Sequence, residues 1–181
     1  MSDIDPSVVD LLVNKHYDAL KSVARAKRRG SRSDVMLLTT DLLHETWFKL
    51  RKGSEWTDEA HFLRTCAVAM RQVIIDSARK HVRTKRGGGV VHEDFEDWQH
   101  VLPDFSETPE ELLIVNDLIE TLQSETPELA EIVDLRYFGG FTETETARIL
   151  DTSERTVRRK WKLARAWLAS EMAQAASDHS A

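Results

Sequence analysis

Signals for the start of a helix recur along this chain, whereas signals for β-strands are almost absent. Asp5-Pro6 and Thr126-Pro127 each place a capping residue before a proline, which is favoured at the first helical position. Thr108-Pro109-Glu110-Glu111 adds a capping-box glutamate, and Thr142-Glu143-Thr144-Glu145 has the box without the proline. Apolar residues recur at helical spacing behind these caps. The pattern predicts an all-α fold.

The caps and the periodicity divide the chain into two small helical domains. Arg86-Gly87-Gly88-Gly89 ends the third predicted helix, and an acidic stretch separates it from the next cap. The predicted N-terminal helices lie near 6–29, 33–51 and 58–84. The predicted parts are an N-terminal domain over 5–86, a flexible acidic linker over 87–107 and a C-terminal domain over 108–174.

Charge is distributed unevenly, which the net charge of -6 conceals. The stretch 87–111 contains eight acidic residues and neither Lys nor Arg, whereas basic residues dominate 64–86 and 148–165. Clustered Lys and Arg are the electrostatic signature of a nucleic-acid contact. The chain therefore offers two basic segments on either side of an acidic one. The acidic segment either mimics nucleic-acid charge or is a plain solvated linker.

Composition excludes several other classes of protein. No apolar run approaches the roughly 20 residues of a membrane span, and the acidic N-terminus does not resemble a signal peptide, so we expect a cytoplasmic protein. Cys66 is the single cysteine, and its apolar helical position indicates an inert buried thiol. His44-Glu45 begins like a zinc-protease motif, but Phe48 replaces the second histidine. We therefore expect neither catalysis nor a metal or other cofactor.

The segment 142–168 has the pattern of a helix-turn-helix. A short helix with the small residue Ala147 is followed by the turn Leu150-Asp151-Thr152-Ser153, and Ser153 caps a longer helix. An apolar stripe on that helix is formed by Val157, Trp161, Ala164 and Leu168. Its remaining sides predict DNA contacts at Arg155, Thr156, Arg158, Arg159, Lys160 and Lys162. The alternative is a surface helix with a solvated basic face.

Longer stretches resemble a known family. LRYFGGFTETETARILDTSERTVRRKWKLARAWL resembles region 4 of extracytoplasmic-function sigma factors, which reads the minus-35 promoter element. TTDLLHETWFKLRKG resembles region 2.2, which docks on the β′ coiled coil of RNA polymerase, and AHFLRTCAVAMRQVIIDSARKHVRTKRGGG resembles regions 2.3 and 2.4, which melt and read the minus-10 element. The family often has Gly where this chain has Asp151, and aspartate tolerates the left-handed conformation better than most residues.

This resemblance implies roles for the N-terminal half. On the helix 58–84 an apolar face leaves the polar residues outward, which implies DNA contacts by Arg64, Arg71, Gln72, Arg79 and Lys80. The family's loop before this helix captures a flipped base, and Trp56 offers a stacking surface there. Alternatively, Trp56 fills the domain core. The polymerase contact is implied at Asp41, Leu42, Glu45, Trp47 and Phe48.

Thr39 and Thr40 stand at the start of the docking helix, where relatives more often have acids. Phosphorylation would supply charge at this helix start, so a serine/threonine kinase could regulate the chain in place of an anti-sigma factor. Alternatively, these threonines only cap or pack the helix. The implied partners are core RNA polymerase, through its β′ coiled coil and β flap, and promoter DNA. A stand-alone helix-turn-helix regulator with an N-terminal sensing domain is the alternative function, and a helical scaffold would leave the two basic segments unexplained.

Overall fold

The structure is a computed structural model that describes residues 44–46, 48–50, 57–86 and 108–178. The described residues are helical or lie in turns, and they contain no strand, which confirms the all-α prediction. Residues 44–46 and 48–50 lie within the predicted helix 33–51 and are helical. The predicted helix 6–29 and the linker 87–107 lie outside the described residues, as do Thr39, Thr40, Asp41, Leu42, Trp47 and Trp56.

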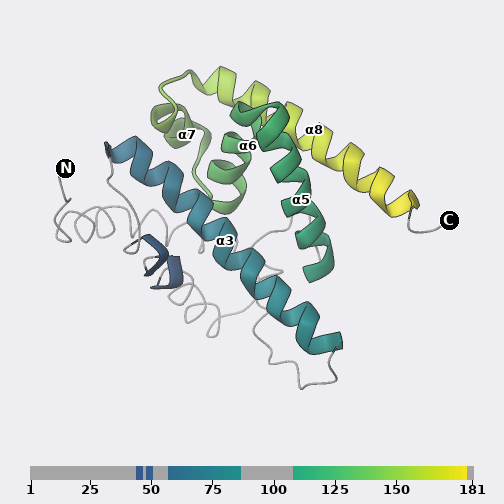
Figure 1. Cartoon of the computed structure of the whole chain (residues 1–181). Coiled ribbons are helices and arrows are strands. Elements are labelled where there is room, and N and C mark those ends of the chain that lie inside the picture. The colour runs from purple at the N-terminus through teal and green to yellow at the C-terminus, as the bar shows by residue number, and fades with distance from the viewer. Residues whose placement is uncertain (1–43, 47, 51–56, 87–107, 179–181) are drawn as a thin grey trace, which may run out of the picture.

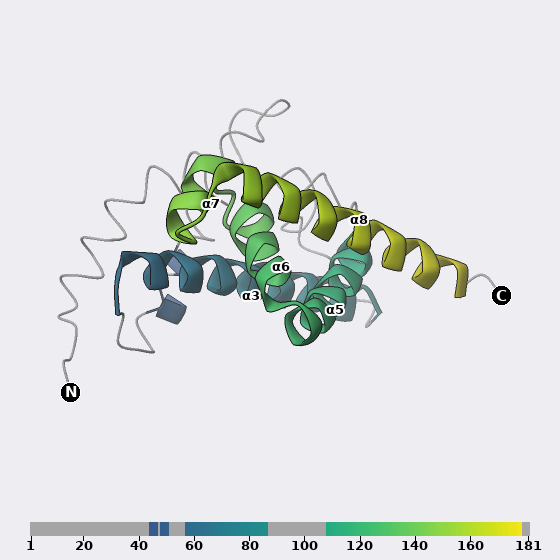
Figure 2. The same ribbon diagram turned by 90° about the horizontal axis from the view of Figure 1, so that it is seen from above.

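The described residues form five helices that Figure 1 labels and one π-helical turn between α6 and α7. They are α3 (Glu59–Arg86), α5 (Pro109–Glu125), α6 (Pro127–Val133), the π-helical η2 (Asp134–Phe138), α7 (Glu143–Ile149) and α8 (Glu154–Asp178). In Figure 2, α6 lies between α3 on one side and α8 on the other. α5 and η2 pack against α3, and α6 and α7 pack against α8.

The predicted caps form with the expected chemistry. Thr108 and Thr142 each close a reciprocal capping box with the glutamate three residues later. Ser153 begins α8 and accepts a hydrogen bond from the Thr156 N–H at 3.1 Å. At Thr126 no side-chain capping bond forms, and the proline alone begins α6.

Buried side chains of the N-terminal and C-terminal halves form a single cluster. Phe62 and Ile74 of α3 belong to it together with Val115 of α5, Leu135 of η2 and Leu168 of α8. The apolar face predicted for α3 is confirmed, because Phe62, Cys66, Ala69 and Ile74 are buried and Val73 is partly buried. What the periodicity did not predict is that the two halves share this core. Over the described residues, no helix is long and apolar enough to cross a membrane.

The C-terminal half also contains a π-helical turn that the sequence pattern did not predict. In η2 the Gly139 N–H donates to the Asp134 carbonyl at 2.7 Å, five residues back. A Cβ on Gly139 would lie 2.9 Å from the Leu135 carbonyl oxygen and 3.0 Å from the Phe141 ring, so glycine is needed there. This turn places Asp134, at the start of η2, against α3.

Candidate nucleic-acid interface

The turn between α7 and α8 has the geometry that a helix-turn-helix requires. Asp151 adopts a left-handed conformation with φ 47°, the one non-glycine residue of the described chain with positive φ. Behind it, the Thr152 N–H donates to the Ala147 carbonyl at 2.9 Å and the Asp151 N–H to the Arg148 carbonyl at 3.4 Å. These two bonds form a Schellman motif, which ends α7 and redirects the chain into α8.

The apolar stripe predicted for α8 is confirmed. Val157, Ala164 and Leu168 are fully buried, and Trp161 is 8% exposed. Trp161 lies beneath two cations, with the guanidinium carbons of Arg136 and Arg165 5.7 and 5.8 Å from its ring centroid. The stripe holds α8 against α6 and α7, and this packing determines which side of α8 faces solvent.

The six predicted contact residues of α8 divide into two groups in the structure. Arg158 donates to Oε2 of Glu143 at the start of α7, from Nε at 2.9 Å and from a terminal nitrogen at 2.7 Å. The hydrogen bond from Arg158 lowers the pKa of the Glu143 carboxyl below its usual value. Lys160 pairs with Glu128 of α6, and the Thr156 hydroxyl bonds to the Ser153 hydroxyl at 2.9 Å. These three residues are therefore engaged within the domain.

Arg155, Arg159 and Lys162 form the second group. All three are exposed, and none of them makes an ion pair with another described residue. Their spacing of four and three residues places them on one face of the helix. We call this face the α8 basic stripe. It is the part of α8 that can offer guanidinium and ammonium groups to a phosphate or a base edge.

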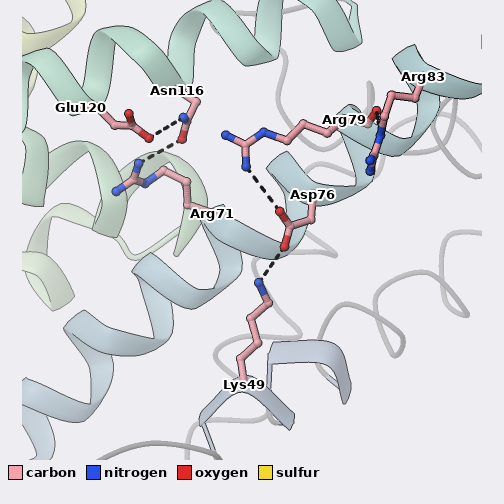
Figure 3. Close-up of polar contacts among 7 residues, drawn as sticks. All are labelled: Lys49, Arg71, Asp76, Arg79, Arg83, Asn116 and Glu120. Atoms are coloured by element: carbon pink, nitrogen blue, oxygen red, sulfur yellow. Dashed lines mark hydrogen bonds and ion pairs between the residues drawn. The ribbon is translucent and has the colours of Figure 1, made fainter. Parts of the chain in front are cut away.

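On α3 the predicted outward residues also divide. Gln72, Arg79 and Lys80 are exposed. Arg79 lies beside Asp76 (Figure 3), and one of its terminal nitrogens is 3.5 Å from Asp76 Oδ1. The opposite carboxylate oxygen of Asp76 binds Lys49 at 2.8 Å, which attaches residues 48–50 to α3. This exposed part of α3 agrees with the expected orientation.

Arg71 does not face outward, and this expectation was wrong. Its Nε binds Asp134 Oδ1 at 2.7 Å, and its terminal nitrogens donate to Asp134 Oδ2 at 3.4 Å and to Asn116 Oδ1 at 3.1 Å. The side chains of Arg71 and Asp134 are only 12% and 4% exposed. Figure 3 shows Arg71 pointing toward Asn116, which in turn donates to Glu120. The buried carboxylate of Asp134 explains the position of Arg71, since a buried ion needs a partner.

Arg64 also turns toward the C-terminal half. Its Nε lies 3.2 Å from Glu131 Oε1 of α6, and a terminal nitrogen donates to the Ile149 carbonyl of α7 at 3.0 Å. Its side chain keeps 41% exposure. Arg64 and Arg71 are seven residues apart and thus share one face of α3. That face is directed at the C-terminal helices.

Sequence reasoning missed the acceptors Asn116, Glu131, Asp134 and Glu143. Asp134 carried a usable signal, because it interrupts the apolar run Ile132-Val133-Asp134-Leu135 and an acid in such a run needs a buried partner. Burial raises the pKa of Asp134 to about 6, against the opposing effect of Arg71, with Glu131 raising it further. The identity of the partner could not be derived from the run itself.

Of the predicted polymerase contacts, the structure describes Glu45 and Phe48. Both are exposed, and Phe48 keeps 54% exposure, which is high for a large apolar side chain. Their spacing of three residues places them on the same helical face. The two predicted polymerase contacts that the structure describes are therefore accessible at the surface.

Two observations concern the reactive and metal-binding groups among the described residues. Cys66 is buried, as predicted, and burial raises the pKa of its thiol to about 12. Within these residues no three His, Cys, Asp or Glu side chains gather into a group that could hold a metal ion.

A family model described as ECF sigma factor matches residues 2–174, which is nearly the whole chain and includes both basic segments. No curated protein and no solved structure matches the chain significantly. The match spans the N-terminal and the C-terminal half together.

Proposed function

The chain belongs to the ECF sigma factor family and acts in promoter-directed transcription, and we propose that its two halves divide this work as the family's regions 2 and 4 do. Residues 5–86 would bind core RNA polymerase and the minus-10 element, and residues 108–174 the minus-35 element. Residues 87–107 would connect the two. The polymerase would catalyse RNA synthesis, and this chain would select the promoter.

The α8 basic stripe is the observation that carries this proposal. An exposed helix that follows a helix-turn-helix turn fits the major groove of DNA. Arg155 lies in the first turn of α8, where recognition helices meet base edges, so we assign base reading to Arg155 and Arg159. Lys162 lies further along the helix and would contact phosphate. Arg158 and Lys160 would support the stripe through Glu143 and Glu128, and Thr156 would stabilise the start of the helix.

Region 2 would contribute Trp56, Arg64, Arg71, Gln72, Arg79 and Lys80 to the minus-10 contact. Gln72, Arg79 and Lys80 are exposed, and Arg79 would exchange its ion pair with Asp76 for a DNA contact. The polymerase contact would use Asp41, Leu42, Glu45, Trp47 and Phe48 against the β′ coiled coil, and the C-terminal half would bind the β flap. The exposed pair Glu45 and Phe48 supports this assignment, because an interface of this kind combines an apolar anchor with complementary charge.

We further propose that phosphorylation of Thr39 or Thr40 by a serine/threonine kinase strengthens polymerase binding. A phosphate near the start of the docking helix would add a charge of about -1.5 to -2 that arginines on the coiled coil can pair. The measurement is the affinity of core polymerase for the parent, for Thr39→Ala and Thr40→Ala, and for kinase-treated protein. If core polymerase binds the kinase-treated and the untreated parent with equal affinity, a kinase does not regulate the chain in this way. Control would then belong to an anti-sigma factor.

Run-off transcription tests the main proposal. Core polymerase with a library of genomic fragments should give discrete transcripts only when this chain is added. Because transcription requires polymerase binding, the chain should first be shown to co-elute with core polymerase. A chain that binds DNA but never core polymerase would instead be a stand-alone helix-turn-helix regulator.

A further inference from the structure

One acidic side chain lies among the basic residues at the start of α8. Glu154 is the first residue of this helix, it is exposed, and the next residue is Arg155 of the α8 basic stripe. DNA phosphates repel a carboxylate at such a place, so the acid lowers the affinity for DNA of any sequence. An acid in the first turn also interacts favourably with the helix dipole, which is the alternative role of Glu154. The contacts of its carboxylate decide whether it can also bind a base.

The carboxylate of Glu154 is held by a hydroxyl group of α7. The two helices pack beside each other (Figures 1 and 2), and the Thr144 hydroxyl donates to Glu154 Oε1 at 2.9 Å. Arg158 stands four residues further along α8, the spacing at which an acid and a base often pair on a helix, but it binds Glu143 of α7 instead. Among the described residues, Glu154 therefore forms no ion pair, and its Oε2 accepts no hydrogen bond.

A carboxylate that is fixed at one oxygen and free at the other can accept a hydrogen bond from a base edge. In the major groove the amino groups of cytosine (N4) and adenine (N6) are donors, whereas guanine O6 and thymine O4 are acceptors. Adenine also presents the acceptor N7 beside its amino group, and N7 repels the second carboxylate oxygen. Cytosine presents a C–H group there, so a carboxylate at this place favours cytosine over the other three bases.

We propose that Glu154 is a specificity-determining residue that accepts a hydrogen bond from N4 of a cytosine in the minus-35 element, and that Thr144 is its positioning residue. This inference deepens the proposed function and rests on it, because it names a base that the same helix reads. Arg155 and Arg159 can only donate to base edges, whereas Glu154 can only accept. An acid without an ion pair also acts against wrong sequences, because it is repelled by the acceptor groups of guanine and thymine.

Selection from a pool of DNA duplexes with a randomised central segment measures this base preference, with the full chain bound to core polymerase. The parent should enrich a motif in which one position favours cytosine by about tenfold over the other bases. Glu154→Gln should change the preference at that position to adenine, since a glutamine amide pairs with both N6 and N7 of adenine. A cytosine preference that is unchanged in Glu154→Gln would overturn the proposal.

Glu171→Gln is the matched control, because it removes the same charge from the same helix about 26 Å from Glu154. This control should select the same motif as the parent. The free Glu154→Gln chain should bind a fluorescent random-sequence duplex roughly two- to threefold more tightly than free Glu171→Gln, because a negative charge near the phosphates is removed. If Glu154 only stabilises the helix, its replacement should weaken binding to every sequence, and that result would contradict the proposal.

Two substitutions at the exposed Thr144 test the positioning role. Thr144→Val removes the hydroxyl but keeps the shape of the side chain, so the cytosine preference should fall by roughly threefold as the carboxylate loses its hydrogen bond. Thr144→Ser keeps a hydroxyl and should retain the preference of the parent. Equal cytosine preferences in the two variants would show that Thr144 does not position Glu154.

Failure of the proposed function gives a different result from failure of this inference. If the parent does not co-elute with core polymerase and enriches no sequence, the proposed function is wrong and the inference falls with it. If the parent binds core polymerase and enriches a motif that Glu154→Gln leaves unchanged, the proposed function stands and only the role of Glu154 is refuted.

Discussion

Arg71 and Asp134, 63 positions apart in the chain, form an ion pair in which Nε lies 2.7 Å from Oδ1 while both side chains are almost excluded from water. The pair connects α3, which we propose contacts minus-10 DNA, with the π-helical turn η2 of the C-terminal half, which we propose binds the minus-35 element. It is the most buried ionic contact between the two halves in the part of the chain that the structure describes.

Removing one member of this pair should be costly. Arg71→Ala leaves the Asp134 carboxylate buried without its cation, and we expect the free energy of unfolding to fall by about 3–5 kcal/mol, as for other broken buried pairs. Urea denaturation followed by circular dichroism measures it. Asp76→Ala is the matched control, because its pairs with Lys49 and Arg79 are half-exposed and should contribute about 0–1 kcal/mol. A loss at Arg71 no larger than the loss at Asp76 would show that the pair is not buried in solution.

The ionisation of Asp134 should make stability depend on pH in a direction unusual for a paired carboxylate. Its pKa is raised from 3.8 to about 6 in the folded chain by burial, with Arg71 lowering it and Glu131 raising it further. The folded state therefore holds a proton more tightly, and the contribution of this group is present below about pH 3.8 and is lost as pH rises through about 6.

The comparison with Asp134→Asn isolates this effect, because asparagine resembles the protonated acid. The stability of the parent relative to Asp134→Asn should fall by roughly 2–3 kcal/mol between pH 4 and pH 7, because each tenfold difference in proton affinity between the folded and unfolded chain corresponds to about 1.4 kcal/mol. Thermal or urea unfolding at several pH values measures the difference. If the stability difference between the parent and Asp134→Asn stays constant or grows with pH, the effect of Arg71 on the pKa of Asp134 outweighs the effect of burial.

The α8 basic stripe should control upstream DNA binding. Arg155→Ala and Arg159→Ala should each weaken binding to a minus-35 fragment by about 1–3 kcal/mol, and Lys162→Ala should weaken it less and reduce the slope of the salt dependence by about one. Fluorescence anisotropy at several salt concentrations measures both quantities. Arg165→Ala, outside the stripe, is the control. If the three stripe variants bind as the parent does, the recognition face is wrongly assigned.

Trp161 should be required for the C-terminal module to fold. Its ring is 8% exposed and packs beneath Arg136 and Arg165, so Trp161→Ala should lower the free energy of unfolding by about 3–5 kcal/mol. Leu163→Ala, two residues away on the same helix but 58% exposed, should cost less than about 0.5 kcal/mol. If the two variants lose similar free energy of unfolding, the apolar stripe that carries Trp161 is not the buried side of α8.

Much of the local structure followed from residue types alone. Thr108, Thr142 and Ser153 cap helices as predicted, because a short hydroxyl side chain before a helix accepts from the free N–H groups of its first turn. Asp151 was expected to tolerate a left-handed turn, and it adopts one. These features depend on a few neighbouring residues, and the sequence order contains all of them.

The orientation of α3 could be predicted only in part. Helical periodicity correctly identified Phe62, Cys66 and Ile74 as buried and Gln72, Arg79 and Lys80 as exposed. It placed Arg71 on the outside because this residue lies off the predicted apolar face of the helix. The partner, Asp134, lies far along the chain, and no local pattern connects the two residues.

The sequence by itself thus determined the described α-helices, the caps at Thr108, Thr142 and Ser153, the apolar stripes and the helix-turn-helix, since each depends on interactions within about one or two turns. The tertiary structure alone decided which basic residues are paired with acids of the same chain. Arg155, Arg159 and Lys162 form no ion pair with another described residue, whereas Arg158, Arg64 and Arg71 bind Glu143, Glu131 and Asp134. The physical reason is that a charge is stabilised by whatever lies beside it in space, and packing brings together acids and bases that periodicity treats as independent.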